Sequence, residues 1–227
     1  MSEAIVPGLY GIFGPVNVYV LDDGDEGVTI IDAGLPWAWQ GVLDLVRDIG
    51  RTPQDVRHIV ITHADLDHVG GLGRLVRATG ATVYASALSQ RYIQKRQPPP
   101  HVPAPMKFVA SAVAFIMQRA ARVDHVFADG DVLDIAGSLR VMATPGHTED
   151  HFSVYWEREG VLFTGDLLNN NDGVSLTPKN ITWSTDAACA SARNVLELDA
   201  QVMCFGHGPV WRAAEDPDGL AALRARL

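Results

Sequence analysis

The sequence has few cysteines, few basic residues and no long apolar run. Its two cysteines, Cys189 and Cys204, form no Cys-x-x-Cys pair, so the chain lacks a disulfide framework and a cysteine metal site of that kind. The longest largely apolar stretch, residues 108–117, has ten residues, about half the length of a membrane-spanning helix. We expect two buried, reduced thiols and no membrane segment.

Basic residues are outnumbered by acidic ones. Lysine and arginine total 18 against 27 aspartate and glutamate residues, which gives a formal net charge of −9. Nucleic acids and anionic membranes attract basic surfaces, so the charge argues against both kinds of partner. The first eight residues, Met-Ser-Glu-Ala-Ile-Val-Pro-Gly, lack the basic start and apolar core of a secretory signal. We therefore expect a cytoplasmic protein.

The remaining composition is that of an ordinary globular protein. Hydrophobic residues make up 47% and charged residues 20% of the chain, close to the roughly 45–50% and 25% of soluble domains. Such a chain can bury a sizeable core, and 227 residues fit one large β-rich domain. We predict a single domain over residues 1–227.

Runs of β-branched residues alternate with helical patterns, which predicts an α/β (α+β) fold with helices outside the sheets. A proline-rich stretch followed by an apolar helix interrupts this alternation, and we interpret it as an insertion at about residues 97–122. The predicted strands lie at 16–21, 28–32, 58–62, 82–85, 131–144, 152–156, 161–165 and 201–205, and the predicted helices at 37–49, 69–79, 106–121, 186–198 and 220–227.

Four potential metal ligands follow the buried strand at 58–62. His63, Asp65, Asp67 and His68 lie within six residues, where the chain leaves the sheet. A helix would spread these side chains around its axis, whereas a tight loop can bring them together. Imidazole and carboxylate groups bind zinc, manganese and iron. The alternative is a solvated acidic turn.

Three later residues occupy similar positions at the ends of predicted strands. His147 follows a Pro-Gly turn, Asp166 ends the strand at 161–165, and His207 stands between two glycines after the strand at 201–205. Each alone has a structural explanation: a capped loop histidine, an aspartate closing a turn, or a histidine bonded to backbone. Histidine or aspartate at four strand ends in this order indicates a metal site instead.

This ordered set resembles the metallo-β-lactamase superfamily, whose signature is His-x-His-x-Asp-His followed by a histidine, an aspartate and a final histidine. The resemblance extends from Val16 to Gly208 and implies a four-layer αββα sandwich with two divalent metal ions at one edge. Zinc is favoured, with manganese or iron as alternatives. By position, the resemblance assigns His63, Asp65 and His147 to one ion, Asp67, His68 and His207 to the second, Asp166 to both, and Asp32 to support of the ligand loop.

The chain departs from the signature at Asp65, which replaces the second histidine. A carboxylate still binds metal, so the site is altered and not abolished. A site with two divalent ions, three aspartates and a bridging hydroxide would have no net charge, whereas the usual signature leaves a net charge of one positive unit. The extra oxygen ligand also suits manganese or iron better than an all-imidazole set does.

The implied activity is that of a hydrolase with a metal-bound hydroxide. Asp67 would be the catalytic residue, orienting the hydroxide and passing its proton to the leaving group. His151 lies four residues beyond His147, and we interpret it as supporting the ligands and not binding the metal itself. His58, His101 and His125 are isolated in sequence, and for each we expect a surface or packing role.

The predicted substrate is a small ester, thioester or lactone. Phe108 and Phe115 of the insertion, together with Trp37 and Asn169, are the candidate pocket residues; the alternatives are helix packing or a homodimer interface for the insertion, core packing for Trp37 and a polar turn for Asn169. Two other functions remain open: a diiron redox protein that works with a separate partner, and a non-catalytic metal-binding protein.

Overall fold

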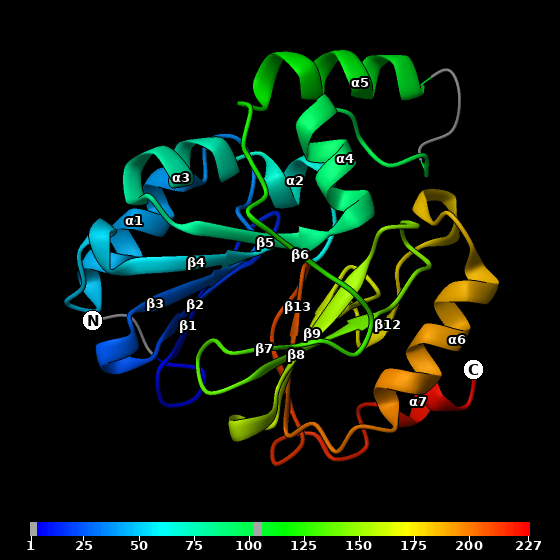
Figure 1. Ribbon diagram of the computed structural model, residues 1–227. Coiled ribbons are helices and arrows are strands. Elements are labelled where there is room, and N and C mark those ends of the chain that lie inside the picture. Colours follow the sequence, from blue (N-terminus) through cyan, green and yellow to red (C-terminus); the bar gives the residue numbers. More distant parts are fainter. Residues whose placement is uncertain (1–3, 102–105) are drawn as a thin grey trace.

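The computed structural model describes residues 4–101 and 106–227, and two six-stranded sheets form its centre (Figure 1). The first sheet has the order β1-β2-β3-β4-β5-β6 and the second β14-β13-β10-β9-β8-β7. The strands of the first sheet are β1 Leu9–Ile12, β2 Val18–Asp22, β3 Val28–Ile31, β4 Val56–Val60, β5 Thr82–Ser86 and β6 His125–Phe127. Those of the second are β7 Val132–Leu133, β8 Leu139–Ala143, β9 Phe152–Trp156, β10 Val161–Gly165, β13 Val202–Phe205 and β14 Trp211–Arg212.

Helices lie outside both sheets (Figure 1). A two-stranded ribbon of β11 Leu168–Asn169 and β12 Ser175–Leu176 follows β10. The helices are α1 Trp39–Asp48, α2 Leu66–Val69, α3 Leu72–Thr79, α4 Ala87–Lys95, α5 Met106–Met117, α6 Thr185–Leu196 and α7 Ala221–Arg224. None of the helices in the described part of the chain is long and apolar enough to cross a membrane.

Three buried hydrophobic clusters separate four layers. Because side chains alternate along a strand, neighbouring residues of β4 point into different clusters: Ile59 packs with α1, α3 and α4, whereas Val60 packs between the sheets. In β10, Phe163 faces the other sheet and Leu162 packs with α6 and α7. This arrangement confirms the predicted αββα sandwich.

The carboxyl ends of several strands meet at one edge. β3 and β4 pair in parallel in the first sheet, and β10 and β13 do so in the second. Parallel strands bring whatever follows them to the same edge of a sheet. Asp32 follows β3, His63 follows β4, and His207 follows β13. The strand order thus carries residues that are distant in sequence to one place.

The predicted helix at 69–79 begins earlier and is broken. α2 ends at Val69 and α3 starts at Leu72, with two glycines between them. A Cβ atom on Gly71 would lie 2.3 Å from the carbonyl oxygen of Ala33, so the close approach of these two segments requires glycine. β1, β6, α4 and the two-residue strands β11, β12 and β14 were not predicted, and helix α5 ends at Met117, before the predicted end at residue 121.

Candidate metal centre

The loop after β4 and the short helix α2 turn several imidazoles toward one point. The ring centroid of His63 lies 4.1 Å from that of His68 and 5.2 Å from that of His147. All three side chains are buried. The predicted loop therefore carries His63, whereas His68 reaches the same place from the short helix α2 and His147 from the segment between β8 and β9.

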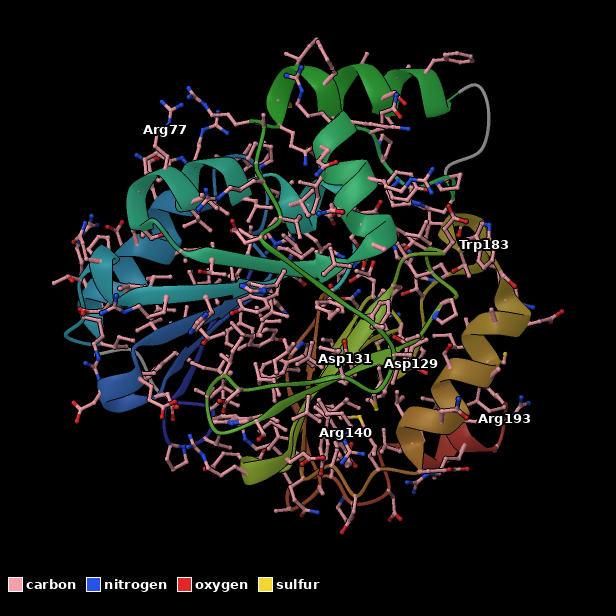
Figure 2. All side chains as sticks on the ribbon, in the orientation of Figure 1. Arg77, Asp129, Asp131, Arg140, Trp183 and Arg193 are labelled. Atoms are coloured by element: carbon pink, nitrogen blue, oxygen red, sulfur yellow. The ribbon has the colours of Figure 1, made fainter. Side chains whose placement is uncertain are left out.

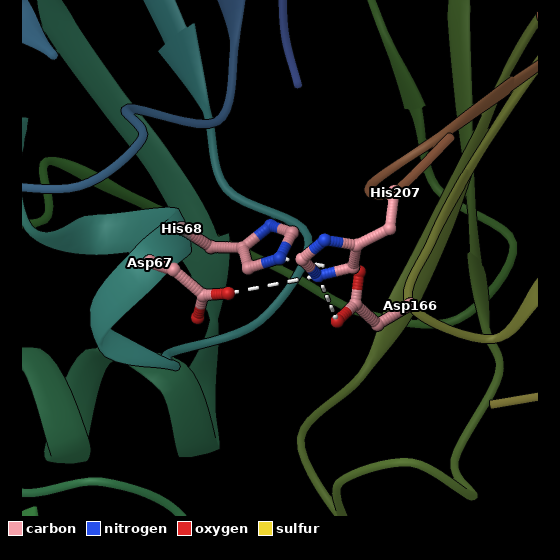
Figure 3. A group of neighbouring side chains, drawn as sticks. All are labelled: Asp67, His68, Asp166 and His207. Carbon is pink, nitrogen blue, oxygen red and sulfur yellow. Dashed lines mark hydrogen bonds and ion pairs between the residues drawn. The ribbon is translucent and has the colours of Figure 1, made fainter. Parts of the chain in front are cut away.

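One group of ligand atoms comes from Asp67, His68, Asp166 and His207, all within 4.8 Å of one another (Figure 3). The Nε2 atom of His207 lies 3.1 Å from Asp166 Oδ2 and 3.6 Å from Asp67 Oδ2. His68 Nε2 lies 3.2 Å from the other oxygen of Asp166, Oδ1. These four residues are the set assigned to the second ion together with its bridging aspartate.

A second group comprises His63, His147 and Asp166. Asp65 lies beside it, with its Oδ2 atom 3.0 Å from His147 Nε2 and 3.7 Å from His63 Nε2. Asp166 belongs to both groups, because its Oδ2 atom is also 3.7 Å from His147 Nε2. The structure thus brings together all seven predicted ligands, with Asp166 between the two halves.

Hydrogen bonds from Nδ1 fix the tautomer of three histidines. His207 Nδ1 lies 2.6 Å from the carbonyl oxygen of Pro15 and must donate, since a carbonyl only accepts. His68 Nδ1 donates to Asp32, and His63 Nδ1 donates to the Thr62 hydroxyl, which itself donates to Asp32. In each neutral ring the Nε2 atom then presents its lone pair to the cluster, as metal-binding histidines commonly do.

Several buried polar atoms in the cluster lack a hydrogen-bond partner, and we tested whether they suit a metal ion. They are His63 Nε2, His68 Nε2, Asp65 Oδ1 and Asp166 Oδ1. Leaving such atoms unsatisfied costs about 1–3 kcal/mol each. Lone pairs of nitrogen and oxygen that face one another are satisfied by a cation between them. The donor set therefore fits a divalent transition metal.

The carboxylates of the cluster favour a positive charge among the imidazoles. Burial by itself would lower the pKa of His68, but Asp166 and Asp32 together raise it well above the ordinary histidine value. Burial would likewise raise the pKa of Asp166, yet attraction to His68 and the contact with His207 hold it well below its usual range. A bound cation would supply the charge that these pairs otherwise obtain from protons.

Comparison with known proteins decides the family. The sequence profile of the metallo-beta-lactamase superfamily matches residues 11–207, a span that contains all seven candidate ligands. The chain belongs to the metallo-beta-lactamase superfamily. A metallo-beta-lactamase family protein of Thermus thermophilus has a similar structure, with a TM-score of 0.73 and 25% identity, covering 98% of this chain and 80% of that one.

The sequence relatives include proteins named as a thioesterase and as a hydroxyacylglutathione hydrolase. The uncharacterised protein YobT of Bacillus subtilis is 29% identical over 89% of this chain and 87% of YobT. An atrochrysone carboxyl ACP thioesterase of a Cryptosporiopsis species is 28% identical over 78% of this chain and 45% of its own length. A hydroxyacylglutathione hydrolase of Rhodobacter capsulatus is 33% identical over 50% of this chain and 34% of its own length. The chain spans less than half the length of these last two.

His151 and Asp32 belong to neither ligand group, but each is hydrogen-bonded to a candidate ligand. His151 accepts a hydrogen bond at Nε2 from the backbone N–H of Asp166, and its Nδ1 bonds to Thr144 Oγ1. Both ring nitrogens are thus occupied, and neither is free for a metal. Burial, together with His63 and His147, lowers the pKa of His151 well below its usual value, which keeps it a neutral acceptor. Asp32 accepts from the Thr62 backbone N–H as well as from Thr62 Oγ1 and His68.

Two side chains that contact the ligand loop were not recognised in the sequence. His101 was expected at the surface or in packing, but its Nε2 atom lies 3.3 Å from Asp65 Oδ2. Asp150 is buried, and it accepts hydrogen bonds from the backbone N–H of Ala64 and from Ser89 Oγ. It was detectable in principle, because it stands directly before His151 in the segment that carries His147. For His101 no local pattern gave a signal.

The four predicted pocket residues differ in how far their side chains are exposed. The side-chain amide of Asn169 donates to the carbonyls of Ser175 and Leu176 in β12, so the expectation that this amide is available to a substrate is wrong. Trp37, Phe108 and Phe115 are largely exposed, and their role in a pocket stays a prediction. Trp183, not recognised earlier, is exposed just before α6 (Figure 2), and its backbone N–H donates to the carbonyl of His147.

Gly206 supports the bridging aspartate by having no side chain. A Cβ atom there would lie 2.0 Å from Asp166 Oδ1 and 2.9 Å from His68 Cε1. We expect Gly206→Ala to displace Asp166 and to weaken metal binding by about tenfold or more. A tenfold loss of affinity corresponds to only about 1.4 kcal/mol of binding free energy, which a displaced ligand readily exceeds. Isothermal titration of the metal-free protein with Zn²⁺ measures this. Gly41→Ala is the control, because a Cβ at Gly41 meets no atom within 4 Å; equal affinities in both variants would refute the prediction.

Proposed function

We propose that this protein is a metal-dependent hydrolase of a small ester, thioester or lactone. The observation that carries the proposal is the orientation of the histidines: Nδ1 of His63, His68 and His207 is hydrogen-bonded, while Nε2 faces the buried carboxylates. Acyl-group hydrolysis is supported by the superfamily relatives named as a thioesterase and a hydroxyacylglutathione hydrolase.

The proposed ligands divide into two sets that share Asp166. His63, Asp65 and His147 would hold the first ion, and the remaining ligands, Asp67, His68 and His207, the second. Divalent ions bound there polarise a carbonyl and lower the pKa of water to near neutrality. Zinc is our first choice of metal, and manganese and iron are the alternatives that the carboxylate at position 65 favours.

Asp67 is the carboxylate best placed to act on a substrate. Its side chain is 34% exposed, against 10% for Asp65 and 6% for Asp166. One oxygen, Oδ2, faces His207, which leaves the other oxygen able to reach solvent or substrate. We infer that Asp67 orients the attacking water, takes its proton and delivers that proton to the leaving group.

Two features bordering the cluster suit a small substrate. A cleft of about 570 Å³ includes Gly208, the residue after His207, in its lining, together with Phe13, Asn171 and Arg212. The indole of Trp183 is exposed, and the backbone N–H of this residue donates to the carbonyl of His147. The apolar surface, amide and cation of the cleft would hold an acyl compound with a polar end. The net charge of −9 supports a small molecule in preference to nucleic acid as the substrate.

A substrate panel tests the proposal. Protein loaded separately with zinc, manganese or iron is assayed against an aryl ester, a thioester, a lactone and an aryl phosphodiester, and with iron also for oxygen reduction. We expect turnover of at least one acyl substrate, its loss on metal removal, and a large decrease in kcat in Asp67→Asn but not in Asp172→Asn, whose side chain is exposed. Metal-loaded protein that cleaves no acyl substrate, or cleavage that survives complete metal removal, would refute it.

A further inference from the structure

His101 lies in the segment between α4 and α5, which the sequence marks as an insertion. Three consecutive prolines, residues 98–100, precede it, and its backbone N–H donates to the carbonyl of Pro99. Because proline restricts the unfolded chain, such a segment holds its conformation at a lower entropic cost than a flexible loop does. The imidazole of His101 is only 7% exposed. A proline-rich turn therefore buries this side chain among the candidate ligands.

The neighbours of His101 are the residues assigned to the first metal ion. Ligand atoms of Asp65, His101 and His147 lie within 4.8 Å of one another. The Oδ2 atom of Asp65 is 3.3 Å from His101 Nε2 and 3.0 Å from His147 Nε2. Ligands that share a tetrahedral zinc ion are about 3.4 Å apart, given bonds of about 2.1 Å. The spacing is therefore that of atoms around one ion.

Asp65 stands where the superfamily signature has a histidine. The first metal site assigned by that signature therefore has one imidazole fewer in this chain. We propose that His101 replaces it as a ligand of the first ion, an inference that rests on the proposed metal-dependent function. The first site would then contain His63, Asp65, His101 and His147 together with the shared Asp166, and the insertion would be joined to the metal centre through its own side chain.

A positioning role, in which His101 only holds Asp65, makes a different prediction. The distance of 3.3 Å between the imidazole and the carboxylate fits either role. Glutamine at position 101 keeps an N–H donor of similar reach but is a poor metal ligand. A positioning role is therefore retained in His101→Gln, whereas a ligand role is lost in both His101→Gln and His101→Ala.

Cobalt titration of the metal-free protein distinguishes these roles. Calorimetry and the visible spectrum of bound Co²⁺ are recorded for the wild type, His101→Ala, His101→Gln and the control His125→Ala. The His125 ring is stacked on Tyr84 and belongs to none of the ligand groups. We expect two ions in the wild type and in the control. In both His101 variants the affinity of the first site should fall by more than about 100-fold, beyond the roughly 10–100-fold effect of residues that only orient a ligand. The first-site absorption bands should change, and the second site should be unaltered.

Each outcome decides between the claims. Wild-type affinities and spectra in both His101 variants would overturn the ligand role and leave the proposed function standing. A loss in His101→Ala that His101→Gln restores would also overturn it, in favour of positioning. A wild-type chain that binds no ion would overturn the proposed function, and the inference on His101 with it.

Discussion

Asp166→Asn is expected to abolish hydrolysis and to weaken both metal sites. The two carboxylate oxygens of Asp166 face different histidines, with Oδ1 at 3.2 Å from His68 and Oδ2 at 3.1 Å from His207. Asparagine keeps the shape but loses the charge, and turns an N–H₂ group toward one of the ions. We expect a decrease in kcat/KM greater than the roughly 10²–10³-fold caused by removal of one electrostatic contact in other enzymes. Elemental analysis and steady-state kinetics on the same sample measure both effects.

The matched control for this variant is Asp172→Asn, which makes the same change in an exposed loop six residues later. It should retain wild-type metal content and activity. Far-ultraviolet circular dichroism of both variants separates loss of the site from loss of the fold. An Asp166→Asn protein with two bound ions and wild-type activity would contradict the role of this residue as the shared ligand.

Asp32→Asn is expected to weaken metal binding although Asp32 is assigned to neither ion. Its carboxylate accepts from His68 Nδ1 at 2.8 Å and from Thr62 at both the backbone N–H and the hydroxyl. Asp32 has a φ of +63°, a conformation that asparagine also tolerates, so the variant retains the backbone. An amide N–H₂ facing one of these donors should decrease the free energy of unfolding by about 1–3 kcal/mol.

The metal affinity of Asp32→Asn should fall by about 10–100-fold, the usual effect of losing a partner that orients a ligand. Urea unfolding of the metal-free protein and calorimetric titration with Zn²⁺ measure the two effects separately. The control Asp25→Asn changes an exposed residue of the turn before β3 and should alter neither. Wild-type affinity in Asp32→Asn would show that this hydrogen-bond network does not orient His68.

Most of the candidate site could be predicted because its residues follow strands. His63, Asp166 and His207 each stand just beyond a β-branched or apolar run, and strand topology carries such ends to a common edge. The cluster of four ligands within residues 63–68 is visible without any structure. The shared position of Asp166 was expected from the family resemblance, but the distances of its two oxygens, 3.2 Å to His68 and 3.1 Å to His207, come from the structure.

His101 escaped prediction for a physical reason. It follows a proline-rich stretch with no periodic pattern, and its approach to Asp65 depends on the path of the whole segment after α4. Tertiary contacts of this kind leave no local signal. Asn169 failed for a related reason: proximity to Asp166 in sequence suggested an available amide, but the β11–β12 ribbon uses that amide for its own backbone.

The missed elements are short or weakly patterned. β6 is a three-residue strand with two exposed positions, and β1 is a four-residue strand that includes Gly11. α4 has only two fully buried residues, Ser89 and Ile93, so its apolar face is too narrow to recognise. The long β-branched strands and the amphipathic helices α1 and α3 were predictable because burial on one face imposes a periodic pattern.

The metal content of the native protein tests the central claim most directly. Protein purified under mild conditions without chelators is analysed for transition metals by elemental analysis and by native mass spectrometry, and its hydrolytic activity is measured on the same sample. We expect about two transition-metal ions per chain, with activity that is lost on their removal and recovered on their return. A folded, hydrolytically active chain that carries no transition metal would contradict the assignment of this cluster as a catalytic metal centre.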